Sequence, residues 1–193
     1  MKTEIRPERI TDYNRTDEEL QAFLIFAIAV AGKQANAVSA KVNRMLSSWG
    51  TAPFDYLRAN RNKIEEIMRG WKMGPYEKRM VPAMNAIIDM DLRSCTTADL
   101  ESIMGVGPKT SRFFILHSRP NQEYVVLDVH LLRYLKREFR MKKIPKGTPS
   151  GNRYLDIEGK AIEKIKSRYP EMSFADFDLN AWLKMRSKGE KVK

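Results

Sequence analysis

Residues 100–116, LESIMGVGPKTSRFFIL, decide the fold of this chain, together with residues 127–132, LDVHLL. Apolar side chains recur at helical spacing after Thr97, a residue type that caps helix N-termini. A pair of glycines then stops this helix, and Pro108 suits the first position of a new one. The stretch therefore predicts two short helices joined by a tight glycine hairpin, with Lys109 in the first turn of the second helix.

The hairpin itself predicts a contact with nucleic acid. Leu100, Ile103 and Met104 are expected on the inner face of the first helix. Gly105 and Gly107 expose backbone N–H groups without a side chain in the way. A helix N-terminus opened by such a glycine pair is a ready phosphate site, so the hairpin is expected to read the DNA backbone.

Lys109 and Asp128 are the candidate reactive residues. The positive end of a helix dipole disfavours a lysine cation, and burial disfavours it further, so Lys109 is pushed toward its neutral, nucleophilic form. Asp128 precedes an apolar helix predicted over 129–139, so we expect it to cap that helix with its carboxylate held in place.

The run MGVGPKTS at 104–111, followed by VLDVH at 126–130, resembles the helix-hairpin-helix plus Gly/Pro-Asp signature of the endonuclease III and 8-oxoguanine DNA glycosylase superfamily. By this resemblance, Lys109 forms a Schiff base with the sugar, and Asp128 lies beside the reacting anomeric carbon. A lone Gly-x-Gly is weak evidence, whereas this pair of motifs is fairly specific.

The same signature suggests further DNA contacts. Hairpin residues Gly105, Val106, Gly107 and Thr110 are expected to bind DNA. His130 invites a general-base interpretation, but two residues past Asp128 on a helix its side chain points elsewhere, so a structural role or a phosphate contact is expected.

Two other segments resemble parts of the family's cleft. QANAVS at 34–39 is similar to a loop whose glutamine fills the gap left by a flipped base, which makes Gln34 the candidate wedge; the alternative is a solvated loop glutamine. Residues 70–79 contain a Gly-x-Tyr-x-x-Arg spacing, so Tyr76 or Trp71 is expected to stack on a base unless these aromatic residues belong to the core.

The C-terminal stretch narrows the resemblance. DLNAWL at 178–183 and the final Lys193 look like the archaeal-type 8-oxoguanine DNA glycosylases of the second class. The resemblance places Trp182 and Lys193 in the lesion pocket; the alternative for Trp182 is core packing. Asp128-Val-His stands where that class more often has Asp-Arg-His, which leaves the lesion specificity open.

Composition bounds the function. The 193 residues carry 35 Lys+Arg against 24 Asp+Glu, a net charge of +11, and nucleic acid is the natural partner of such a surface, although a merely basic protein would have the same charge. The single cysteine, Cys95, excludes an internal disulfide framework and a four-cysteine iron–sulfur cluster within this chain. No secretory signal or membrane-spanning run is evident, so an intracellular, DNA-associated protein of the cytoplasm or nucleoid is expected.

The predicted fold is all-α, because no strand-type alternation persists anywhere. Two helical lobes are expected around a DNA-binding cleft. Residues 1–35 and 117–193 are predicted to form one lobe, and residues 36–116 the other, with the helix-hairpin-helix motif at 97–116.

The resemblance implies a bifunctional DNA glycosylase and AP lyase that flips out 8-oxoguanine, excises it through a lysine Schiff base and nicks the strand by β-elimination. An endonuclease III-like enzyme for oxidised pyrimidines and a non-enzymatic DNA-binding module are the alternatives. The expected partner is double-stranded damaged DNA, bound by a monomer. No metal or organic cofactor is required, although the family allows a monovalent cation at the hairpin carbonyls.

Overall fold

The structure is a computed structural model that describes residues 4–73 and 77–189, and at 77, 78 and 186–189 the main chain alone. The described chain is all-α and contains no strand, as predicted. Its helices, in chain order, are η1 (Pro7–Arg9), α1 (Asp17–Ala29), α2 (Ala35–Trp49), α3 (Pro53–Ala59), η2 (Arg61–Lys63), α4 (Ile64–Gly70), α5 (Glu77–Ile87), α6 (Thr97–Glu101), α7 (Pro108–Ser118), α8 (Val129–Glu138), α9 (Gly151–Arg168) and α10 (Phe174–Gly189).

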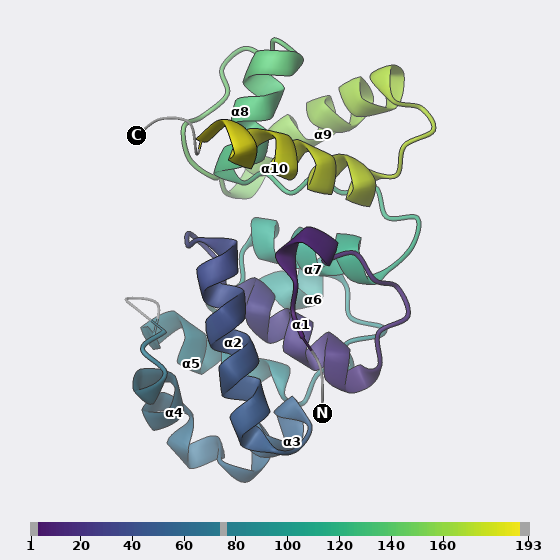
Figure 1. The fold of residues 1–193 in the computed structure, drawn as a ribbon. Coiled ribbons are helices and arrows are strands. Elements are labelled where there is room, and N and C mark those ends of the chain that lie inside the picture. Colours follow the sequence, from purple (N-terminus) through teal and green to yellow (C-terminus); the bar gives the residue numbers. More distant parts are fainter. Residues whose placement is uncertain (1–3, 74–76, 190–193) are drawn as a thin grey trace.

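The helices form two groups, each around its own hydrophobic core (Figure 1). The N-terminal group comprises η1 to α7, and its core runs from Ile5 to Ile115. The C-terminal group comprises α8 to α10, and its core runs from Leu116 to Ala181. Phe113 packs against both cores, so α7 is the helix on which the two groups meet.

Helix α1 is the centre of the N-terminal group. Thr16 caps it through a complete capping box with Glu19. Every residue from Ala22 to Ala29 is buried, and the helix packs against α2, α3, α5 and α7. A helix that is apolar on all sides requires a partner on each of them, which this position supplies.

The predicted division of the chain is wrong for its N-terminal segment. Residues 1–35 were expected beside residues 117–193, but Ile5, Ile10 and α1 lie in the core of the N-terminal group. The apolar surface of α1 runs all the way round, so it gives no direction from which to infer the neighbouring helices. The boundary between the two cores falls near the predicted one, within α7.

Candidate active site

The glycine hairpin between α6 and α7 has the predicted form, with one shift at its start. Thr96, one residue before the predicted Thr97, caps α6 through a capping box with Asp99. Gly105 has φ +94°, and a Cβ there would lie 2.7 Å from the carbonyl oxygen of Arg79. Both the backbone angle and the approach of α5 therefore require glycine at this position.

The predicted hairpin contacts separate into exposed and buried residues. Gly105 and Gly107 are exposed, whereas the side chains of Val106 and Thr110 are buried. Met104, expected on the inner face of the first helix, is instead 71% exposed because α6 ends at Glu101. The accessible surface of the hairpin is therefore glycine backbone with one apolar side chain beside it.

Lys109 occupies the first turn of α7, directly after Pro108, as predicted. Its side chain is half-buried, and Nζ lies 4.8 Å from the centroid of the Phe113 ring. Within the part of the chain that the structure describes, Lys109 makes no ion pair. Burial lowers the pKa of Lys109, against the opposing charges of Asp128 and Asp178, so the neutral amine is favoured relative to a lysine in water.

Asp128 caps α8, as predicted, and its Oδ1 accepts a hydrogen bond of 2.7 Å from the amide of Leu131. This bond fixes the direction of the carboxylate. Burial raises the pKa of Asp128, whereas the charge of Lys109 lowers it and that of Asp178 raises it. The lysine and the two carboxylates are thus close enough for each charge to act on the others.

Helix α9 sets the position of Asp128 relative to α7. The buried Tyr154 hydroxyl donates to Val125 O at 2.8 Å and accepts from Leu127 N at 3.0 Å, which fixes the segment directly before Asp128. Glu158 of the same helix binds the Arg112 guanidinium on α7 at 2.8 and 2.9 Å. One helix therefore holds both sides of the site.

Asp178 and His117 are components of this site that the sequence argument missed. Asp178 lies on α10, and its Oδ2 is 3.1 Å from Nε2 of the fully buried His117. The two residues are 61 positions apart in the sequence, so no local motif predicts their contact. The available signal was the spacing of Lys109, Phe113 and His117, which puts the three side chains on one face of α7.

The other residues predicted to bind DNA or the lesion differ in how far they are buried. His130 is half-buried in the first turn of α8, and its enclosed Nδ1 has no hydrogen-bond partner among the described residues. Trp182 is half-buried on α10, one turn beyond Asp178 and therefore on the same helix face. Tyr76 and Lys193 lie outside the described residues.

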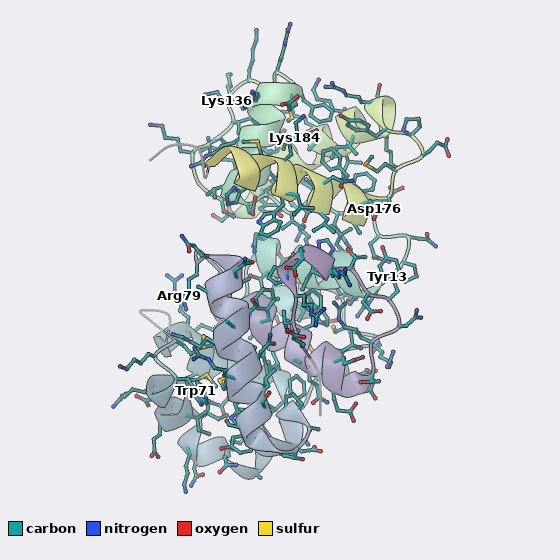
Figure 2. The ribbon with its side chains drawn as sticks, viewed as in Figure 1. Tyr13, Trp71, Arg79, Lys136, Asp176 and Lys184 are labelled. Atoms are coloured by element: carbon teal, nitrogen blue, oxygen red, sulfur yellow. The ribbon has the colours of Figure 1, made fainter. Side chains whose placement is uncertain are left out.

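The loop before α2 carries Gln34, which is exposed at the N-cap position at the end of α2 nearer the C-terminal group (Figure 1). The neighbouring Lys33 donates to the carbonyl of Met73, which ties this loop to the segment that leads toward Tyr76. Trp71 is half-buried against the core of the N-terminal group, which favours the core alternative for this residue (Figure 2).

The described residues contain neither a cluster of metal ligands nor a membrane-spanning helix. No group of three or more His, Cys, Asp or Glu side chains is arranged to hold a metal ion in residues 4–73 and 77–189. Over the same residues, no helix has the length and apolar character that crossing a bilayer demands.

The chain is similar to 8-oxoguanine DNA glycosylases in part of its sequence and in its fold. No protein-family model matches the chain. The 8-oxoguanine DNA glycosylase/AP lyases of Thermotoga petrophila and Thermotoga maritima are 34% identical to it over 87 residues, which are 45% of this chain. The aligned part spans only 40% of the length of these curated relatives.

Two solved structures resemble the whole chain. The 8-oxoguanine DNA glycosylase of Methanocaldococcus jannaschii superposes with a TM-score of 0.67 at 21% identity, covering 95% of this chain and 85% of that one. The same archaeal enzyme in complex with a 15mer DNA containing 8-oxoguanine gives a TM-score of 0.60 at 21% identity, with coverage of 97% and 90%. The chain therefore has the fold of the Methanocaldococcus jannaschii 8-oxoguanine DNA glycosylase, which confirms at the level of fold the resemblance carried by the hairpin motif.

Proposed function

We propose that this chain is a bifunctional DNA glycosylase and AP lyase that excises 8-oxoguanine from double-stranded DNA. The observation that carries the proposal is Lys109, a half-buried lysine with a lowered pKa and no ion pair among the described residues, beside the fixed carboxylate of Asp128. In a structural ion-pair network, each cation is paired with carboxylates. A half-buried lysine without such a partner has the properties of a nucleophile. The named activity of the Thermotoga relatives supports the same assignment.

The reaction begins with a base that the enzyme has flipped out of the duplex. The Lys109 amine forms a bond to C1′ of the sugar while the bond from C1′ to the base breaks, and the base leaves with the electron pair of that bond. Asp128 stabilises the positive charge that develops on the sugar. The nitrogen then loses a proton and the C1′–O4′ bond of the sugar ring breaks, with O4′ taking up a proton, which converts the new C1′–N bond into an imine. The protonated imine makes the C2′ proton acidic, and loss of that proton expels the 3′ phosphate and nicks the strand.

The surroundings of Lys109 suit this substrate. The exposed backbone of Gly105 and Gly107 lies just before α7, where amide groups favour a phosphate. Trp182 on the Asp178 face of α10 is the proposed stacking partner of the lesion, and Gln34 is the proposed wedge. The proposed reaction of Lys109 requires no metal or organic cofactor. The protein is proposed to act as a monomer associated with DNA. The proposal includes a monovalent cation at the hairpin carbonyls.

Borohydride trapping tests the assignment. Wild type and Lys109→Gln are each incubated with duplexes that carry 8-oxoguanine, thymine glycol or no lesion. A covalent adduct on 8-oxoguanine that disappears in Lys109→Gln supports both the mechanism and the substrate. An adduct on thymine glycol alone moves the substrate to oxidised pyrimidines. No adduct despite intact DNA binding overturns the Schiff-base mechanism and leaves a monofunctional glycosylase or a DNA-binding module.

A further inference from the structure

One face of α7 carries a continuous row of side chains that begins at the proposed nucleophile. The Lys109 ammonium lies over the Phe113 ring, and the Phe113 ring in turn contacts the His117 imidazole edge-on, with 5.0 Å between the ring centroids. The three residues are spaced four apart, so they follow one helix face for two turns. His117 at the end of this row is completely buried.

Asp178 completes the row from the other group of helices. It is half-buried, with 14% of its side chain exposed, and its Oδ2 meets Nε2 of His117 at 3.1 Å. An ionised carboxylate can only accept, so Nε2 carries the hydrogen of this bond. On its opposite side, the imidazole Nδ1 lies 2.8 Å from the Thr11 hydroxyl, and the His117 carbonyl accepts from Arg15 at 2.7 Å.

His117 is therefore fixed from three directions, and it in turn fixes Asp178. Tyr13 and Asp176 lie on the two sides of the same junction, where the N-terminal segment meets the first turn of α10 (Figure 2). This anchor holds the Asp178 carboxylate of α10 against the face of α7 that also carries Lys109.

We propose that Asp178 is a second functional carboxylate of the Lys109–Asp128 site, a positioning residue that His117 anchors and whose charge sets the pH at which Lys109 reacts. This inference rests on the function proposed above, because it concerns the availability of the Lys109 amine.

The direction of the effect follows from the charges around the lysine. Asp128 from the N-cap of α8 and Asp178 from α10 both raise the pKa of Lys109, against the larger effect of burial. His130 on α8 acts on Asp128, and His117 on α7 contacts Asp178. Removing the Asp178 charge therefore increases the neutral fraction of Lys109 at any pH below its pKa.

The test is the pH profile of borohydride trapping on a duplex with a preformed abasic site, under single-turnover conditions. This substrate bypasses base excision and reports the amine directly. Asp178→Asn retains an oxygen that accepts from His117 while it removes the charge. We expect the acidic limb of the profile to move to lower pH, so that the variant traps faster than wild type below the wild-type inflection.

Asp176→Asn is the matched control, because Asp176 loses the same charge on the same helix but is exposed and acts on Tyr13. Its profile should coincide with that of wild type. An Asp178→Asn profile that also coincides with wild type overturns the inference, whereas absence of trapping by wild type overturns the proposed function instead.

A second variant covers the case in which Asp178→Asn does not fold, as judged by a thermal melt. His117→Leu removes the anchor of Asp178 but leaves its charge. We expect the plateau rate to fall several-fold and the inflection to move away from its wild-type pH, because the Asp178 charge is no longer held in one place relative to Lys109. A plateau and an inflection that are both unchanged overturn the positioning role.

Discussion

Two cations lie three residues apart on α7, the buried Arg112 and the half-buried Lys109, and their surroundings differ sharply. Arg112 is bound by both carboxylate oxygens of Glu158 and by Glu101, and its guanidinium lies 4.9 Å from the centroid of the Tyr154 ring. Lys109 has an aromatic ring beneath it and carboxylates that influence it without forming an ion pair among the described residues. The two cations thus lie on the same helix, but in the described chain only Arg112 is paired with carboxylates at hydrogen-bond distance.

This difference shows in the acid–base properties of the two side chains. Burial lowers the pKa of Arg112, but the hydrogen bond and charge of Glu158 outweigh it, and the net shift is upward. For Lys109 burial dominates, and the net shift is downward. A cation that is fully paired holds helices together, whereas an unpaired lysine loses its proton more readily, and the neutral amine has a lone pair that can attack a substrate.

Removing Glu158 should give the largest change in stability. Glu158→Ala leaves the Arg112 cation buried with only Glu101, and also leaves the Val125 amide without the acceptor that lies 3.1 Å away. Breaking such a buried pair costs about 3–5 kcal/mol of unfolding free energy. Urea denaturation measures it, with the exposed Glu163→Ala on the same helix as a control expected within about 0.5 kcal/mol of wild type.

The double variant Arg112→Met/Glu158→Leu sharpens this result. It removes both charges together, so most of the lost stability should return. A change in the unfolding free energy of less than about 1 kcal/mol in Glu158→Ala would contradict the structural role of the Arg112–Glu158 pair, since breaking a buried pair should cost more.

The parts of this site that the sequence predicts are those fixed over a few residues. Asp128 caps the helix that follows it, and Pro108 opens α7, because each of these depends on neighbours within one helical turn. Such contacts are encoded by spacing, so a single sequence reveals them.

The contacts that sequence reasoning missed join distant segments. Arg112 and Glu158 are 46 residues apart, and His117 and Asp178 are 61 apart. Nothing in the spacing around Asp178 distinguishes it from a solvated aspartate on a terminal helix. The packing of α10 against α7 brings it to the lysine, and that packing depends on the whole C-terminal group.

Asp128 allows its structural role to be separated from its chemical one. Asp128→Asn keeps an oxygen that caps α8, whereas Asp128→Ala loses the bond to the Leu131 amide. The alanine variant should be less stable than the asparagine variant by about 1 kcal/mol. Thermal denaturation of the pair measures the cap, while trapping should be impaired in both. Equal stability of the two variants would mean that the observed cap contributes nothing.

Lys109→Met should give the smallest change in stability, and its sign opposes that of Glu158→Ala. The lowered pKa of Lys109 means that the folded protein releases this proton at a lower pH than the unfolded chain, whose lysine titrates near 10.5. Within that window the unfolded state binds more protons, so wild-type stability rises with pH, while Lys109→Met lacks this contribution.

At neutral pH the Met variant should therefore be at least as stable as wild type, by up to about 1 kcal/mol, because it avoids burying a cation and only forgoes the attraction of Asp128 and Asp178. Its advantage should shrink as pH rises toward the lysine's ordinary range. Urea titrations of both proteins at several pH values measure the difference. A Met variant that is clearly less stable than wild type at neutral pH would make Lys109 a structural cation like Arg112, and the contrast between the two would disappear.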